Sequence, residues 1–369
     1  MTVIIVKTIT ETGRRKVSEQ RSFPLRGMVL GILISVVLLV VLQRFFGSSV
    51  DAGTVLRSWK AVLLGLMLFC MAIFIIAVRV YILSRSIGYR IKLIDCYSNS
   101  FLNQFFSAIT PFSAGGQPFQ IYDLTRLGME LSAASAMIIT MFMISNLASV
   151  TLTLFVLPQF IWYFGHTGSA AGIVVTGALI TVVVGGLLMV VALSQRLISS
   201  FSHFLSRRRL LLKLVSRLFR KDEENLSDSI LKRFSNYNKS MKLLWQRSRR
   251  LLLLDYLLAI SHFLCLYAVF YLVVTVVARD GAAASRLGFL DSVAVQSLLS
   301  FVVYYLPTPG SSGGFEGGMF ILLKDVVQND LLPLIVMLWR FVTYHMLILI
   351  GILIFLLTLN RRESGKAQC

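Results

Sequence analysis

The sequence predicts an all-α polytopic membrane protein: an inverted-topology repeat with about six full spans and two re-entrant hairpins of broken helices. Hydrophobic residues make up 56% of the 369 residues, charged residues make up 14%, and the mean hydropathy is +0.78, so the chain is more apolar than a soluble domain. Several apolar runs reach the roughly 20 residues that a helix needs to cross a hydrocarbon core. Two further apolar segments are interrupted at matching positions by Pro, Ser and Gly, which is typical of discontinuous membrane helices.

The formal net charge of +19 does not indicate nucleic-acid binding, because the basic residues flank the apolar runs. In that position they orient the helices and attract anionic lipid. The densely basic segment 195–250 is therefore expected to contact an anionic membrane surface. The four cysteines form no CxxC pair and no Cys/His cluster with metal spacing, so we expect no metal site and no cofactor.

The distribution of Lys and Arg predicts that both termini lie in the cytoplasm. Two segments, near 93–128 and 289–327, fit this rule only if each enters the membrane and leaves it on the same side. The expected full spans lie near 27–46, 60–83, 132–157, 170–193, 251–278 and 332–359. The expected regions are a basic N-terminus (1–26), a first membrane repeat with a connecting helix (27–194), a basic loop (195–250), a second membrane repeat (251–359) and a cytoplasmic tail (360–369).

The two interrupted segments carry similar breaks, TPFSAGG at Thr110–Gly116 and TPGSSGG at Thr308–Gly314. Turns favour Gly, Pro and Ser in general, so this match alone is weak. The same offset of 198 residues, however, also superposes the flanking spans in order. The first copy begins outside and the second inside, which is typical of inverted repeats with a binding site near the midplane.

One buried ion pair is expected, between Glu316 and Arg340. Arg340 lies well inside the last span, where an unpaired charge is costly. Glu316 follows the second break, and its alternative role is to interact with the dipole at a helix start. His345 also lies inside the last span, and the sequence leaves open whether it or Glu316 carries protons.

Other charges are interpreted as interfacial. Arg79 and Asp255 lie toward helix ends, where a side chain can extend to the membrane surface. Asp123 and Arg126 follow the first break and are expected near the cytoplasmic interface.

The motifs PTPGSSGGFEGG (307–318) and LWRFVTY (338–344) resemble the lysylphosphatidylglycerol synthase transmembrane family, which includes the flippase domain of multiple peptide resistance factors. The resemblance implies lipid translocation in a bacterial cytoplasmic (inner) membrane. We expect no aminoacyl-transferase domain after the last span, and neither HExxH nor GxSxG occurs, so enzyme activity is not favoured and no catalytic residue is assigned.

The expected function is therefore a flippase or carrier for a phospholipid or another lipid with an anionic headgroup. A lipid-modifying transferase within the membrane, a carrier of a small soluble anion, and a membrane scaffold are the alternatives. The headgroup, the direction, the energy source and the oligomeric state stay open, and a homo-oligomer is compatible with the sequence. The candidate substrate-binding residues lie in and beside the two breaks, apart from Arg340 in the last span: Asn103, Thr110, Pro111, Gly115, Gly116, Pro307, Pro309, Gly310, Gly313, Gly314, Glu316 and Arg340.

Overall fold

The chain is helical throughout the residues that the structure describes. The computed structural model describes residues 58–164, 236–245 except 238, 249–277, 287–303, 306–327 except 325, 331–364, and three isolated positions at 179, 183 and 186. These residues contain no β-strand. The span expected near 27–46, and that near 170–193 except for the three isolated positions, lie outside them. The prediction of an all-α membrane protein is confirmed.

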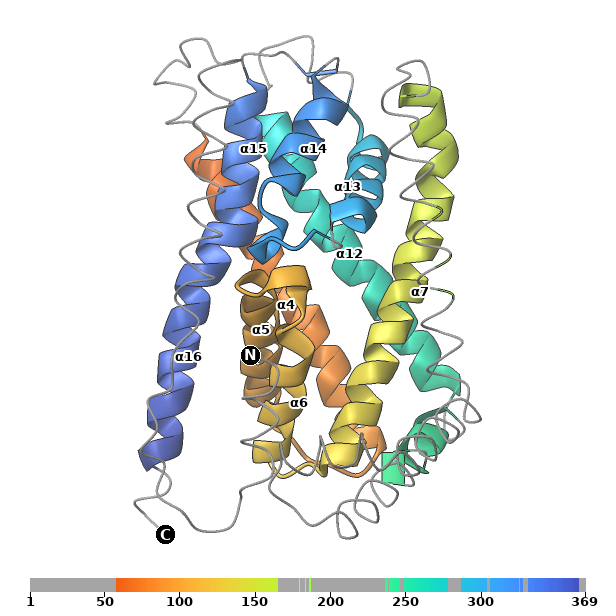
Figure 1. Ribbon diagram of the computed structural model, residues 1–369, viewed down its shortest axis with the longest axis vertical. Coiled ribbons are helices and arrows are strands. Elements are labelled where there is room, and N and C mark those ends of the chain that lie inside the picture. Colours follow the sequence, from red (N-terminus) through yellow and green to blue (C-terminus); the bar gives the residue numbers. More distant parts are fainter. Residues whose placement is uncertain are drawn as a thin grey trace, which may run out of the picture.

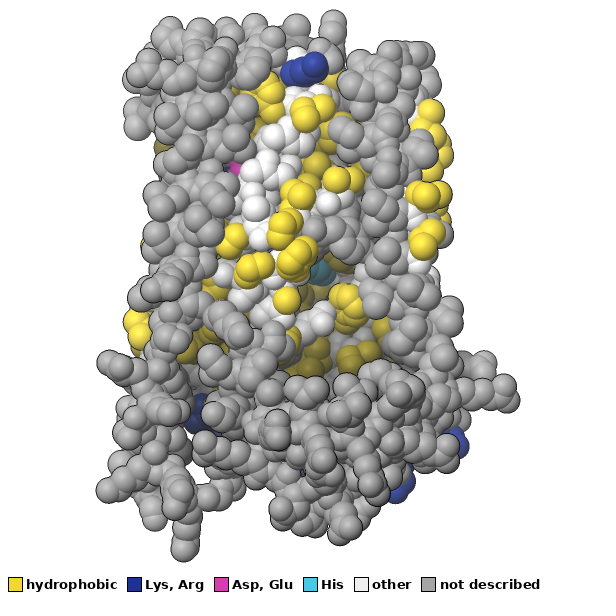
Figure 2. Space-filling model, in the orientation of Figure 1, with side chains coloured by type: hydrophobic (Ala, Val, Ile, Leu, Met, Phe, Trp, Pro, Cys, Tyr) yellow, Lys and Arg dark blue, Asp and Glu magenta, His cyan; other side chains and the backbone are white. Residues whose placement is uncertain are grey.

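Four helical segments within the described residues are long and apolar enough to cross a membrane. At a rise of about 1.5 Å per residue, even the shortest exceeds a hydrocarbon core of about 30 Å. Figure 2 shows hydrophobic side chains along the described part of one face and basic side chains toward its two ends. The four are α4 (Trp59–Ser86), α7 (Leu131–Phe164), α12 (Arg249–Val277), and the run of α15 (Leu332–Arg340), the π-helical turn η3 (Phe341–His345) and α16 (Met346–Ser364).

Two helical hairpins contain the breaks. The first is α5 (Leu93–Ala108), η1 (Pro111–Ser113) and α6 (Gly116–Arg126); the second is α13 (Phe289–Val303), η2 (Pro309–Ser311) and α14 (Gly314–Leu323). The longest of these four helices has 16 residues, about 24 Å, which is too short to cross the core. In Figure 1 the hairpins reach the middle of the molecule from its lower and upper ends. There η1 contacts η2.

A glycine follows the helix before the first hairpin, α4, and another follows the last helix of that hairpin, α6. Gly88 follows α4 with a φ of 93°, and Gly128 follows α6 with a φ of 96°. At α4 the Tyr89 N–H donates to the Ser84 carbonyl at 2.9 Å, and α6 closes with the same type of bond. These are Schellman motifs, which satisfy carbonyls that a helix end would otherwise leave unpaired.

The two breaks share a backbone conformation. Thr110 and Thr308 are extended, with φ/ψ of −114°/144° and −98°/143°. Phe112 (φ 56°, ψ 18°) and Gly310 (φ 60°, ψ 19°) are then both left-handed, and the next residue in each break is a serine with φ 52°. The similarity predicted from the letters therefore extends to the backbone dihedral angles.

Helices α4 and α12 pack against each other over much of their length and run side by side in Figure 1. Buried His262 places Nδ1 2.9 Å from the carbonyl oxygen of Ala72, which joins the two helices by a polar contact. The largest hydrophobic cluster surrounds the second hairpin, and a separate cluster lies among α4, α6 and α7. This packing holds the two hairpins in place.

Phe112 is the non-glycine member of the matched left-handed pair, and 56% of its surface is exposed. A left-handed conformation costs an L-residue about 1–2 kcal/mol, which glycine avoids. Phe112→Gly should therefore raise the free energy of unfolding by about 0.5–1 kcal/mol, measured by denaturation of the purified protein. The matched control is Gly310→Ala, whose Cβ would meet the ring of Tyr344 and should destabilise the protein. A Phe112→Gly protein less stable than the parent would contradict the strain argument.

Candidate functional site

The second break is organised by the ion pair between Arg340 and Glu316. Arg340 Nε lies 2.8 Å from Glu316 Oε1, and both side chains are almost completely buried. Arg340 Nη2 donates to Ser312 Oγ at 3.1 Å and to the Gly310 carbonyl at 3.3 Å. The predicted pairing of Arg340 with Glu316 is confirmed, and the guanidinium also holds the turn itself in place.

Glu316 also caps the start of α14. Its Oε2 accepts a hydrogen bond from the Gly313 N–H at 2.8 Å. Gly313 has a φ of 91°, which a side chain rarely tolerates. The ion pair and the helix-dipole role were alternatives in the sequence, whereas in the structure one carboxylate makes both interactions, because its two oxygens point to different partners.

A π-helical turn, η3, begins directly after Arg340. The guanidinium carbon of Arg340 lies 4.4 Å from the ring centroid of Tyr344, and the Nδ1 of His345 lies 3.2 Å from the Arg340 carbonyl. π-Helical turns are rare and frequently occur at functional sites. Nothing in the letters LWRFVTY distinguishes this turn from an α-helical turn, so the sequence does not predict it.

In the first break, Thr110 makes the contacts that close the turn. Its Oγ1 donates to the Phe106 carbonyl at 2.7 Å and accepts the Gly115 N–H at 2.9 Å. A Cβ on Gly115 would lie 2.6 Å from the Thr110 side chain. A Cβ on Gly116 would meet the Ser107 hydroxyl and the Asn103 side chain. Neither glycine has a positive φ, so both are required by the close packing around the first turn and not by their backbone conformation.

The structure therefore brings the two sets of candidate residues together at one level, because η1 contacts η2. Thr110, Pro309 and Gly116 are buried, while Pro111 and Pro307 are exposed. The binding site expected near the midplane stays a prediction.

Arg79 and Asp255 do not reach the membrane surface, so their interfacial interpretation is wrong. Their side chains are each 2% exposed and form a buried ion pair, with Nε–Oδ1 at 2.7 Å and Nη2–Oδ2 at 3.0 Å. Arg79 also donates to Ser145 Oγ and to the Met141 carbonyl, which joins α4, α7 and α12. The positions of Arg79 and Asp255 along their own helices could not predict this pairing, because it depends on how α4 and α12 pack against each other.

Asp123 and Arg126 differ in exposure, and their expected position near the interface stays a prediction. Arg126 is exposed and lies over the ring of Tyr122. Asp123 is only 1% exposed and accepts a hydrogen bond from Asn99 Nδ2 at 3.0 Å. About one helical turn separates the two residues, and only Asp123 contacts α5, through Asn99.

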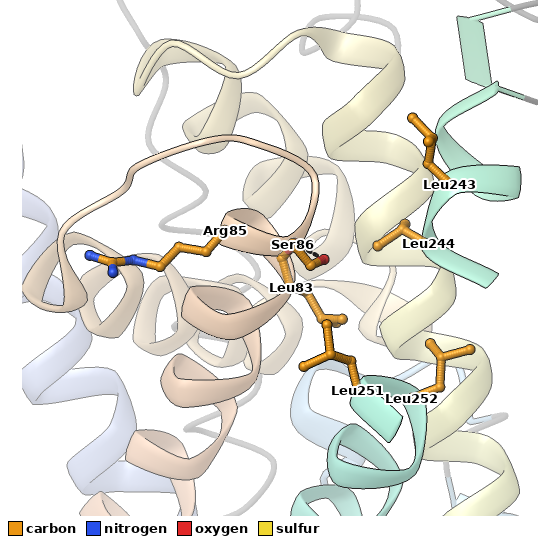
Figure 3. A pocket seen from close by; sticks show the side chains of 7 residues that line it. All are labelled: Leu83, Arg85, Ser86, Leu243, Leu244, Leu251 and Leu252. Atoms are coloured by element: carbon orange, nitrogen blue, oxygen red, sulfur yellow. Dashed lines mark hydrogen bonds between the residues drawn. The ribbon is translucent and has the colours of Figure 1, made fainter. Parts of the chain in front are cut away.

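A cavity of about 350 Å³ lies away from the breaks, where the end of α4 meets the start of α12 and residues 243–244. Its lining combines five leucines with Arg85 and Ser86. In Figure 3 the leucine side chains gather around the space and Arg85 extends away from them. None of the candidate residues at the breaks lines this cavity.

The fold and the buried charges define a polytopic helical membrane protein with two paired helix breaks. The family model for the lysylphosphatidylglycerol synthase TM region matches residues 28–351, and the chain belongs to this family. A UPF0104 membrane protein from Archaeoglobus fulgidus is 24% identical over 324 residues, covering 88% of this chain and 94% of that protein. The family relates the chain to lipid handling in a membrane.

The Glu316–Arg340 pair predicts a non-additive mutational response. Arg340→Ala or Glu316→Ala leaves a buried charge uncompensated, which typically costs about 3–5 kcal/mol. The Glu316→Ala, Arg340→Ala double variant should lose clearly less stability than the sum of the two, measured by thermal or chemical denaturation of the purified protein. Strict additivity would mean that the contact contributes no coupling energy.

Proposed function

We propose that this chain moves a lipid with a polar headgroup between the two leaflets of a membrane. The observation that carries the proposal is the direct contact between two matched helix breaks in the middle of the molecule. Broken backbone at membrane depth is tolerated where protein or a water-filled cavity satisfies its polar groups. Such paired breaks are typical of carriers with a site at the centre of an inverted repeat.

The inverted repeat is part of this proposal. Its support is the shared dihedral angles of the breaks, the common order of a long helix, a hairpin and a second long segment, and the opposite directions of the hairpins in Figure 1. In this arrangement the breaks separate when one half rocks against the other. The headgroup then enters between them while the acyl chains stay in the bilayer.

The helix starts at α6 and α14 supply the proposed contacts to a headgroup phosphate. Helix starts carry amides without intrahelical partners and a partial positive charge. Arg340 is less available, since its Nε and Nη2 already bind Glu316, Ser312 and the Gly310 carbonyl. We therefore assign Arg340 a positioning role, and a direct phosphate contact would follow only when those bonds open.

The proposed partners are a phospholipid or another lipid with an anionic headgroup, an anionic membrane surface at 195–250, and a second copy of the chain. The proposed location is a bacterial cytoplasmic membrane. The flippase domain of multiple peptide resistance factors is the proposed functional counterpart.

Orientation can be tested with matched exposed lysines at the outer ends of the two hairpins, Lys92 before α5 and Lys324 after α14. The charge distribution predicts that Lys92 faces the cytoplasm and Lys324 the outside. In a cysteine-free background and intact cells, a membrane-impermeant maleimide should label Lys324→Cys and miss Lys92→Cys until the cells are permeabilised. Labelling of both, or of Lys92→Cys alone, would contradict this topology.

Transport is tested with the purified protein in liposomes that carry labelled lipids with different headgroups. Gly116→Ala should lower translocation at least about tenfold, because the new methyl group meets Ser107 and the backbone of Asn103 and so forces α5 and α6 apart. Gly314→Ala should lower it less, because its methyl group meets the flexible end of the Leu306 side chain. The control is Gly317→Ala, whose Cβ has no neighbour within 4 Å. Its translocation should match that of the parent.

Liposomes in which no labelled lipid moves faster than in protein-free vesicles would overturn the flippase proposal. Movement of a soluble anion in the same vesicles, without lipid movement, would instead favour the small-anion carrier.

A further inference from the structure

The seam between α5 and α6 is an unusually polar part of the described membrane region. Asn99, Asn103 and Ser107 recur every four residues along α5 and so share one face. Gly116, next to Asn103 and Ser107, and Gln120, whose carbonyl binds Asn99, face them from α6. The seam runs from the outer end of the hairpin to the break, and polar groups at such depth are a functional hypothesis by default.

Buried oxygen atoms in this seam have no partner among the described contacts. Asn99 is fully buried; its Nδ2 donates to the Gln120 carbonyl at 3.1 Å and to Asp123 Oδ2 at 3.0 Å, while its Oδ1 accepts nothing. The Oδ1 of Asn103, one helical turn farther in, is also buried and unpaired. Leaving a buried polar atom without a hydrogen bond costs about 1–3 kcal/mol of stability. A bound ligand that these two oxygens contact would remove this cost.

The chemistry of the seam favours a small monovalent cation. Asp123 is 1% exposed and supplies a carboxylate at the Asn99 end, and the two carboxamide oxygens add neutral ligands. Hard cations prefer oxygen ligands of this kind, and divalent sites usually collect more carboxylates. Within the described residues no cluster of three His, Cys, Asp or Glu side chains could hold a transition metal.

We propose that the α5–α6 seam binds a monovalent cation of the size of Na⁺, through Asp123, Asn99 and Asn103. The cation lies between the outer end of the hairpin and the break. It pulls the two carboxamide oxygens and the carboxylate toward one point, and so stiffens the contact of α5 with α6 just before the turn at Thr110. Cation occupancy thereby sets how firmly the first break is held against the second.

The experiment measures binding, without lipid transport, on the purified full-length protein in detergent. The melting temperature is recorded in NaCl and in choline chloride at equal ionic strength, because choline is too large for an oxygen cage of this kind. NaCl should raise the melting temperature in a saturable way, by about 2–5 °C at saturation.

Two variants and one control locate the site. Asp123→Asn, which keeps the shape of the side chain, should abolish the Na⁺-dependent shift, and Asn103→Ala should weaken the apparent Na⁺ affinity by about tenfold. The control is Ser297→Ala: Ser297 is the buried counterpart of Asn99 at the same offset, and its hydroxyl bonds to the Ala294 carbonyl. Its Na⁺ shift should equal that of the parent.

Equal melting temperatures in NaCl and choline chloride would overturn the proposal and leave bound water as the partner of these oxygens. A full Na⁺ shift in either Asp123→Asn or Asn103→Ala would also overturn it. Because no lipid is transported in this assay, its failure is distinct from a failure of the flippase proposal.

Discussion

The backbone polar groups opened at the two helix breaks are the constraint on which the rest of the structure depends. Hydrocarbon offers them no hydrogen bonds, so each must find a partner inside the protein. In the first break the Thr110 hydroxyl accepts a hydrogen bond from one backbone amide and donates one to a backbone carbonyl. In the second break, Glu316 accepts a hydrogen bond from a backbone amide, and Arg340 donates one to a backbone carbonyl. A buried ion pair is expensive to desolvate, and its position here is explained by the open backbone that it satisfies.

Much of the fold could be predicted from the sequence because its signals are local. Apolar runs of the right length predicted α4, α7, α12 and the last span, and most of the predicted helix ends were within a few residues of the observed ones. Gly, Pro and Ser predicted the positions of both breaks. The pairing of Glu316 with Arg340 could be predicted because an isolated charge at that depth has few alternatives. In these cases a single segment, or a single costly residue, carried the information.

The remaining features depend on how helices rotate against each other, which the sequence of one chain does not reveal. Arg79 and Asp255 lie 176 residues apart and pair only because α4 packs against α12. Asp123 and Arg126 differ by one helical turn, yet one points into the hairpin and the other away from it. The π-helical turn after Arg340 likewise depends on packing around the guanidinium.

The two breaks have nearly the same backbone angles and different side chains. Phe112 stands where Gly310 stands, and the Glu316 that caps the second turn corresponds to Pro118 in the first, which is 198 residues earlier. A protein whose halves were chemically identical would have inward-facing and outward-facing forms of equal free energy. In the proposed rocking of an inverted repeat, the halves would exchange roles with unequal interactions, so the two forms would differ in free energy and one of them would be the resting state. Such a chain would be biased toward one side of the membrane before any substrate or driving force acts on it.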